Sequence, residues 1–209
     1  MGSIDPVHRS ILAVDIERST VDVRTNPIKL ELRAQVYRML LGAMAHAGVD
    51  ACWCEPFEDR GDGVLVLIRP VDELPKPRLL SQLIPELARA LTDYNRALPP
   101  SELARRELRL RAVLHAGEVH LDENGYCGEE VDVACRLLDA PSVKRCLRAA
   151  PGPLVLVVSQ EIYWGIVRHE YDGIGPDTYR PHVWVNVGGR RRRGFVHVPP
   201  APRDEAVPA

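Results

Sequence analysis

Two spacings of apolar residues divide the chain into expected strands and helices. Apolar runs typical of strands lie at residues 10–16, 63–69 (unbroken over 64–68) and 154–159, and weaker strand patterns lie at 51–56, 108–114, 183–187 and 194–198. Apolar residues three or four positions apart, typical of amphipathic helices, mark residues 28–47, 75–98, 129–140, 141–150 and 160–167. The order over residues 10–115 predicts an α/β (α+β) fold with a ferredoxin-like βαββαβ core and a C-terminal extension.

Length and composition fit one domain. The chain has 209 residues, of which 45% are hydrophobic, enough to bury a full core. We expect an N-terminal arm at residues 1–9, a single domain at 10–198 and a disordered tail at 199–209. Five cysteines without a Cys-x-x-Cys pair argue against a disulfide framework.

Charge and hydropathy restrict the partners and the compartment. Basic and acidic residues number 27 and 29, for a net charge of −2, so the general signature of a nucleic-acid-binding protein is absent. The sequence contains no apolar run of membrane-spanning length, and the N-terminus lacks the basic and apolar regions of a signal peptide. We therefore expect a cytoplasmic protein with no membrane and no nucleic-acid partner.

The first candidate functional residue is Asp62, which stands between Gly61 and Gly63 immediately before an apolar strand. Glycine allows the left-handed backbone that a tight turn needs, so the turn would hold this carboxylate at the mouth of a buried strand. The alternative is an ordinary acidic β-turn, for which Asp-Gly is a common signal.

The second candidate is Asp15, the one charged residue inside the apolar run 10–16. A carboxylate there is costly to desolvate unless a positive group compensates it. In the predicted core Asp15 and Asp62 converge on one edge of the sheet, where oxygen ligands without His or Cys favour Mg²⁺ or Mn²⁺ bound to a polyphosphate. The alternative is a buried salt bridge, for example with Arg18 or Arg60.

A third stretch, residues 115–137, contains Asp132 and Arg136 four positions apart in an expected helix. They would share one helical face. A plain ion pair between them, contributing only about 0.3–0.5 kcal/mol when exposed, is the simpler explanation. His115 and His120 are interpreted as packing and surface residues, and the basic run at 190–193 as a solvated hairpin turn or, alternatively, a phosphate contact.

Taken together, the three stretches resemble the catalytic domain of class III nucleotidyl cyclases, the adenylate/guanylate cyclase superfamily. The sequence Asp15-Ile16-Glu17-Arg18-Ser19-Thr20 is similar to the family's first metal motif, and Gly61-Asp62 to the second. Residues 115–137 follow the family's later segment, His-x-Gly-Glu and then Gly-x-x-Val-Asn-x-Ala-x-Arg-Leu, with one exception. The resemblance covers about residues 10–165.

The resemblance implies a head-to-tail homodimer that converts a nucleoside triphosphate to a 3′,5′-cyclic nucleotide and pyrophosphate. Two Mg²⁺ or Mn²⁺ ions would be held by Asp15, Asp62 and the backbone at Ile16. Backbone amides of residues 16–20 would cradle the phosphates. Arg136, supplied by the other subunit, would stabilise the charge that develops on the transferred phosphoryl group.

Three positions depart from the adenylyl pattern. Asp132 replaces the family's Asn, and an ionised Asp cannot donate the hydrogen bond that Asn offers to the ribose. Glu58, at a base-reading position, matches guanylyl cyclases, whereas its partner Gly125 matches neither group. A guanine or cyclic pyrimidine product is therefore favoured over cAMP, and the chain is compatible with bacterial antiphage cyclases that make cyclic pyrimidine nucleotides.

Two other functions compete with an active cyclase. A catalytically degenerate homologue, acting as a nucleotide-binding or protein-interaction module, would explain Asp132 and the incomplete base-reading pair. A diguanylate cyclase or polymerase-palm relative would use a similar core, but the sequence contains no Gly-Gly-[Asp/Glu]-Glu-Phe signature.

Overall fold

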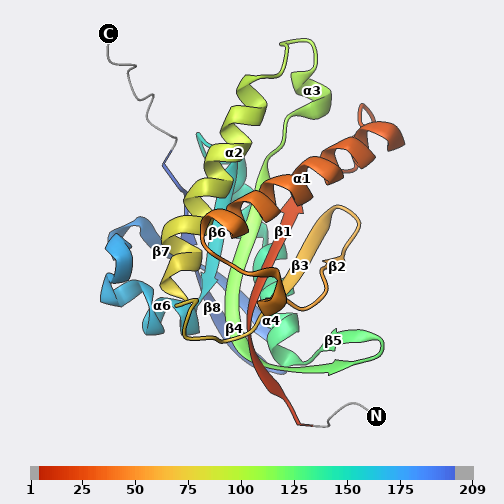
Figure 1. Cartoon of the computed structure of the whole chain (residues 1–209). Coiled ribbons are helices and arrows are strands. Elements are labelled where there is room, and N and C mark those ends of the chain that lie inside the picture. The colour runs from red at the N-terminus through yellow and green to blue at the C-terminus, as the bar shows by residue number, and fades with distance from the viewer. Residues whose placement is uncertain (1–4, 201–209) are drawn as a thin grey trace.

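A computed structural model describes residues 5–200 (Figure 1). Its strands are β1 (Val7–Ile16), β2 (Glu58–Asp59), β3 (Gly63–Ile68), β4 (Leu110–Asp122), β5 (Gly125–Cys127), β6 (Leu154–Ser159), β7 (Tyr179–Val187) and β8 (Arg190–His197). Its α-helices are α1 (Asn26–His46), α2 (Ile84–Arg96), α3 (Leu103–Arg106), α4 (Glu129–Asp139), α5 (Pro141–Ala149) and α6 (Gln160–Gly165). Short 3₁₀ turns lie at Ala51–Trp53, Val167–His169, Tyr171–Gly173 and Pro176–Thr178, and a π-helical turn at Leu79–Leu83 precedes α2.

The strands form one mixed sheet in the order β2-β3-β1-β4-β6-β8-β7, with β5 paired to β4 beside this path. Strands β4 and β6 are parallel, and the other neighbours are antiparallel. The first part, β4-β1-β3-β2, has the strand order of a ferredoxin-like unit. The predicted α+β class and βαββαβ core are therefore confirmed.

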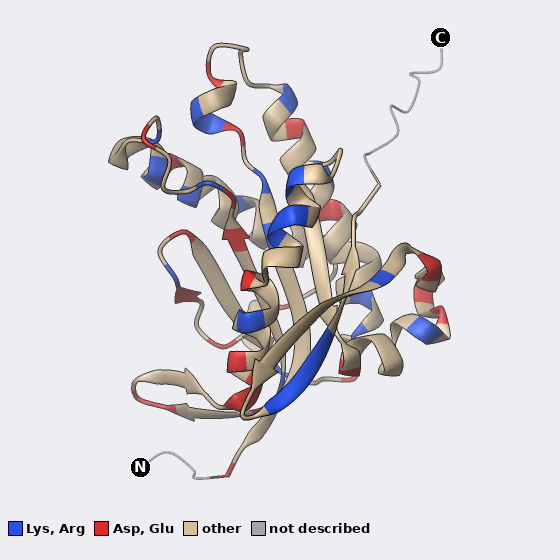
Figure 2. Ribbon diagram, turned by 180° about the vertical axis from the view of Figure 1, so that it is seen from behind, with Lys and Arg blue, Asp and Glu red and all other residues tan. Residues whose placement is uncertain are grey.

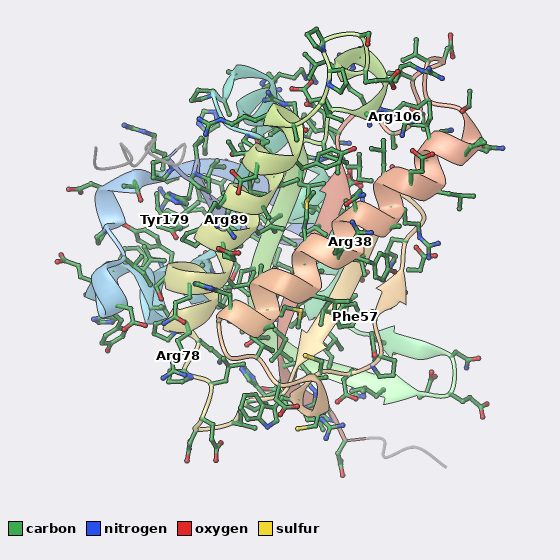
Figure 3. The ribbon with its side chains drawn as sticks, turned by 45° about the horizontal axis from the view of Figure 1, so that its top comes forward. Arg38, Phe57, Arg78, Arg89, Arg106 and Tyr179 are labelled. Carbon is green, nitrogen blue, oxygen red and sulfur yellow. The ribbon has the colours of Figure 1, made fainter. Side chains whose placement is uncertain are left out.

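Helices cover both faces of the sheet because the central strands are apolar on both faces. On β1, Leu12 and Val14 pack with α1 and α2, whereas Ile11 and Ala13 pack with α4 and α5. Figure 1 shows α1 and α2 crossing one face of the sheet. The charged side chains of these helices, such as Arg38 and the ion-paired Arg89, point away from the sheet (Figure 3).

The prediction of a strand at residues 51–56 is wrong. A 3₁₀ turn occupies Ala51–Trp53 because the carboxylate of Asp50 accepts a hydrogen bond from the Cys52 amide at 2.8 Å, a local bond that competes with strand pairing. This segment pairs with the β3 chain through an isolated bridge between Cys54 and Ile68, which includes a hydrogen bond from the Glu55 amide to the Leu67 carbonyl at 2.9 Å, and the two residues of β2 then pair with β3.

Other boundaries shift without changing the fold. Strand β1 begins at Val7, inside the expected N-terminal arm, because Val7 pairs with Val119 of β4. Strand β4 continues to Asp122 and pairs there with β5. Residues 1–4 of the arm and 201–209 of the tail lie outside the described residues. Within residues 5–200, no helix is both long and apolar enough to cross a lipid bilayer.

Candidate active site

The structure brings Asp15 and Asp62 to one edge of the sheet. Asp15 is the penultimate residue of β1 and lies opposite Gly63 in the β1–β3 ladder, and the amide of Ile16 donates to the carbonyl of Asp62 at 2.9 Å. A Cβ atom at Gly63 would stand 2.5 Å from the carbonyl oxygen of Val14. Glycine is therefore required here for the close approach of the two strands.

Asp15 has one compensated and one uncompensated oxygen. Its side chain is 14% exposed, and Oδ2 pairs with the guanidinium of Arg111. Oδ1 is buried and has no hydrogen-bond partner among the described residues. Burial lowers the pKa of Arg111. A salt bridge to Asp15 thus exists, but its partner is neither Arg18 nor Arg60.

The loop after β1 turns toward Asp62. The hydroxyl of Ser19 donates to Oδ2 of Asp62 at 2.5 Å. Arg18 has a left-handed φ of 58°, a conformation that is uncommon outside glycine and typical of tight functional turns. Across residues 5–200, no hydrogen bond is donated by the backbone amides of Arg18, Ser19 and Thr20. Of the expected phosphate cradle at residues 16–20, the amides of Ile16 and Glu17 already donate hydrogen bonds to the carbonyls of Asp62 and Arg109. The three consecutive unpaired amides that follow suit an anion.

Cations from two distant elements complete this edge. A pocket of about 480 Å³ is lined by Asp62, the loop at 16–20, Arg111 of β4, and Lys144 and Arg148 of α5. An adjoining pocket of about 370 Å³ is lined by Asp15, Asp62, Arg60 and Cys135 among others.

Sequence reasoning missed Arg111, Lys144 and Arg148. The Leu/Arg alternation at 108–114 was the one available signal, since it placed Arg111 on a strand.

Asp15 and Asp62 alone supply too few oxygen ligands for a divalent cation, so other oxygen atoms would have to complete its coordination. The described part of the chain contains no group of three or more His, Cys, Asp or Glu side chains suited to a metal. Asp15 and Asp62 supply two carboxylates, and the unpartnered Oδ1 of Asp15 is an oxygen that a cation would satisfy. A hard divalent ion needs six or more oxygen ligands, so backbone, phosphate and water oxygens must supply the rest.

Asp132 and Arg136 lie elsewhere, on an exposed face of α4. Within residues 5–200, neither makes a hydrogen bond or ion pair with the other, nor with Asp15 or Asp62. The simple ion-pair interpretation is therefore not observed. Cys135, between them, lines the pocket beside Asp15. Arg136 itself lines neither of the two pockets at this edge.

The two base-reading candidates occupy β2 and β5. Oε1 of Glu58 pairs with Arg60 at 3.0 Å, whereas Oε2 is buried without a partner in the described structure. Gly125 begins β5 with φ of 122° and open space where a side chain would stand. The hydroxyl of Tyr126 donates to the carbonyl of Pro56 at 2.5 Å, which holds the β4–β5 hairpin near the segment that leads into β2.

Comparison with known proteins rests on structure, because the sequence matches no family model and no curated protein. The guanylyl cyclase Cya2 is similar over 98% of this chain and 98% of its own, with 18% identity and a TM-score of 0.61. The adenylyl cyclase CyaB from P. aeruginosa matches 97% of this chain and all of its own length, with 14% identity and a TM-score of 0.58.

The chain has the fold of a nucleotidyl cyclase catalytic domain. A third similar structure is the catalytic core of a rhodopsin-guanylyl cyclase with converted specificity, in complex with ATPαS, with 12% identity, a TM-score of 0.58, and coverage of 92% of this chain and 94% of that chain. The resemblance drawn from the three sequence stretches is thus confirmed at the level of the cyclase fold.

Proposed function

We propose that the protein is a nucleotidyl cyclase that converts a nucleoside triphosphate to a 3′,5′-cyclic nucleotide and pyrophosphate. The observation that carries this proposal is the buried, unpartnered Oδ1 of Asp15, at a pocket that Asp15 and Asp62 line together with Arg60, Arg111 and Lys144. The cyclase fold of the whole chain supports it. The proposed class is therefore a phosphorus–oxygen lyase.

At this edge, one group of residues would bind the metal ions and another would bind the phosphates. Asp15 and Asp62, with the backbone at Ile16, hold two ions, Mg²⁺ or Mn²⁺. Bound there, these ions would activate the ribose 3′-hydroxyl and polarise the α-phosphate. The unpaired amides of residues 18–20 bind the triphosphate oxygens. Glu17 instead orients the loop, since its carboxylate accepts from Arg109 at 3.1 Å.

Lys144 and Arg148 meet the outer phosphates. They stand four residues apart on α5 and both line the pocket. Lys144 currently pairs with the exposed Asp139 at 2.9 Å, an ion pair worth little in water. A triphosphate can therefore draw Lys144 away at little cost and gain a stronger charge-assisted contact.

The working unit is a homodimer. Arg136 and Asp132 are exposed on α4 and have no partner within the described chain, so a second copy is needed to bring them to Asp15 and Asp62. We call the sheet edge that presents Asp15 and Asp62 the metal edge. In a head-to-tail pair, each subunit supplies the metal edge of one site and Arg136 of the other.

For the base, we propose guanine or a pyrimidine rather than adenine. The free Oε2 of Glu58 is an acceptor, and it suits the N1–H and amino group of guanine or the amino group of cytosine. Gly125 leaves the space beside it open. A cyclic pyrimidine product would place the protein in bacterial antiphage signalling.

A second candidate is a degenerate homologue that binds nucleotide without turnover. Asp132 favours it because this residue replaces a hydrogen-bond donor with a negative charge near a triphosphate. The salt bridge of Arg111 to Asp15 also favours it, because it neutralises one of the two metal-binding carboxylates.

The deciding experiment incubates the purified protein with each of the four nucleoside triphosphates and Mn²⁺, and measures pyrophosphate and cyclic nucleotide by chromatography. A cyclic product from the wild type and none from Asp62→Ala supports the cyclase. Binding of Mn²⁺–nucleotide by calorimetry without product from any of the four supports the degenerate homologue.

A further inference from the structure

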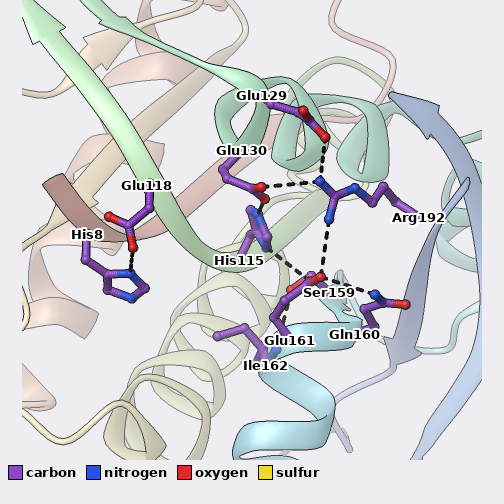
Figure 4. Close-up of polar contacts among 10 residues, drawn as sticks. All are labelled: His8, His115, Glu118, Glu129, Glu130, Ser159, Gln160, Glu161, Ile162 and Arg192. Carbon is purple, nitrogen blue, oxygen red and sulfur yellow. Dashed lines mark hydrogen bonds and ion pairs between the residues drawn. The ribbon is translucent and has the colours of Figure 1, made fainter. Parts of the chain in front are cut away.

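A second polar cluster lies away from the metal edge, where α4 begins. Five side chains from four elements form it, which we call the α4 clamp: His115 of β4, Glu129 and Glu130 of α4, Glu161 of α6 and Arg192 of β8 (Figure 4). Figure 2 shows the basic stretch that contains Arg192 as a continuous band along β8. That stretch is thus a strand rather than a solvated turn.

Arg192 holds three carboxylates at once. Its guanidinium lies 2.5 Å from Glu129, 3.3 Å from Glu130 and 3.6 Å from Glu161. The hydrogen bond to Glu129 raises the pKa of Arg192. A guanidinium shared by carboxylates of two helices fixes the position of one helix relative to the other, because its donors are planar and rigid.

His115 of β4 contacts the same helix, α4, from the sheet side. The ring is fully buried, and Nε2 lies 2.6 Å from Glu130, whose pKa is lowered chiefly by this hydrogen bond. The other ring nitrogen, Nδ1, has no hydrogen-bond partner among residues 5–200, with Glu161 3.7 Å away. A Cβ at Gly117 would lie 2.4 Å from Cγ of Glu130, so the side chain of Glu130 rests directly on the β4 backbone.

Beyond the clamp, the polar ties of α4 within residues 5–200 are those of the exposed Asp139 at its C-terminal end, which pairs with Lys144 at 2.9 Å and Arg111 at 3.7 Å, and exposed ion pairs contribute little. The inward face of α4 consists of Val131, Val133, Ala134, Leu137 and Leu138, all packed in the apolar cluster on this side of the sheet. Apolar contacts are not directional, so they allow small rotations of the helix that the clamp does not. Glu130 precedes Asp132 by two residues and Arg136 by six on the same rigid helix.

We propose that the α4 clamp positions α4 so that Arg136 reaches the active site of the other subunit. Its members are positioning residues and touch no substrate. This inference rests on the proposed function, since it assumes that Arg136 acts across a dimer. It predicts a directional effect: loss of the clamp impairs the site that receives Arg136 from that subunit, and spares the site built on that subunit's own Asp15 and Asp62.

The test uses heterodimers with a single working site. One subunit carries Asp62→Ala and donates Arg136, and the other carries Arg136→Ala and donates the metal edge. The two subunits bear different tags and are purified as the mixed dimer. Arg192→Gln is then placed in either subunit. Arg191→Gln is the matched control, because Arg191 is the next residue on β8 and stacks on Trp184 at 4.0 Å instead of joining the clamp.

We expect Arg192→Gln to lower kcat about 10-fold to 100-fold when it accompanies Asp62→Ala, because small misplacements of a catalytic group cost this much. KM should change little. The same substitution beside Arg136→Ala should leave the rate unchanged, as should Arg191→Gln in either subunit. Circular dichroism and thermal unfolding check folding, and Glu161→Gln replaces Arg192→Gln if the latter does not fold.

Equal rate losses in both placements, or none in either, would overturn the inference while leaving the cyclase intact. A heterodimer that is inactive before the clamp is altered would instead contradict the proposed dimeric site, and this inference with it.

Discussion

The metal edge and the α4 clamp both contain carboxylates and arginines, but the carboxylates of the two regions differ in how far their charges are satisfied. At the metal edge, one buried oxygen of Asp15 has no partner among residues 5–200, and the carboxylate of Asp62 accepts a hydrogen bond from the hydroxyl of Ser19. In the clamp, each of the three glutamates has a cationic or histidine partner. Carboxylates that are already satisfied hold a structure together, whereas carboxylates left short of partners can bind a cation.

The comparison also separates the buried Arg111 from the mostly buried Arg192, whose side chain is 16% exposed. Arg192 has three carboxylates around it, whereas Arg111 has Asp15 and, at 3.7 Å, the exposed Asp139. If a cation binds Asp15, as proposed, Arg111 keeps Asp139 as an alternative partner at 3.7 Å. Arg192 is surrounded by Glu129, Glu130 and Glu161, and it keeps these partners.

The largest expected effect comes from Asp62→Ala. It removes one of the two carboxylates at the metal edge, so turnover should be abolished, and calorimetry should show much weaker binding of Mn²⁺–nucleotide. The unfolding temperature should change little, because Asp62 is exposed. Asp72→Ala, at another exposed acidic position, is the control. Unchanged Mn²⁺–nucleotide affinity in Asp62→Ala would show that the open edge is not the metal site.

Arg136→Ala should have the next largest effect on activity. We expect the rate to fall about 10²–10³-fold, the typical cost of removing a preorganised donor at the transition state. Its exposed position predicts no loss of stability. Steady-state kinetics measure the rate, and mixing with Asp62→Ala should restore one good site per heterodimer. No recovery after confirmed subunit exchange would contradict the arrangement across two subunits.

In the clamp, Glu130→Gln should act on stability. The hydrogen bond to His115 and the charge of Arg192 lower the pKa of Glu130, so its contribution is complete above the ordinary pKa of a glutamate and is lost as pH falls through the lowered value. We expect a loss of about 1.5–3 kcal/mol at neutral pH, the range for hydrogen bonds to charged groups. Urea unfolding from pH 7 to about 3 should show this difference shrinking.

A difference that instead grows on acidification would contradict that sign. Glu118→Gln is a suitable comparison, because Glu118 pairs with His8 at 2.9 Å but its side chain is 58% exposed. Exposed pairs contribute little, so this variant should change stability by less than Glu130→Gln at every pH.

The smallest effect is expected from Asp132→Asn, which restores the family's donor at nearly constant volume. If Asp132 is adapted to the native substrate, the substitution should lower the native rate several-fold. If the chain is a degenerate homologue, activity with some nucleoside triphosphate should rise or appear. We expect the former, and product analysis with all four nucleotides distinguishes the two.

The sequence predicted the frame of the site well, because that frame depends on local pattern. The run 10–16 and the Gly-Asp-Gly turn placed Asp15 and Asp62 at strand ends, and the ferredoxin-like order placed those ends together. The failure at residues 51–56 was also local: the hydrogen bond that Asp50 accepts from Cys52 outweighed a short apolar pattern. The roles of Glu58, Gly125 and Thr20 stay predictions.

What the sequence alone determined is therefore the positions of the two carboxylates and the strands that present them, since apolar runs and glycines act within a few residues. The tertiary structure decided which cationic side chains pair with the carboxylates of the metal edge and of the α4 clamp. Arg111 meets Asp15 across 96 positions of sequence, and Arg192 meets Glu129 across 63. Such partners follow from strand order and register in the finished sheet, where electrostatic contacts form between segments that no local pattern relates.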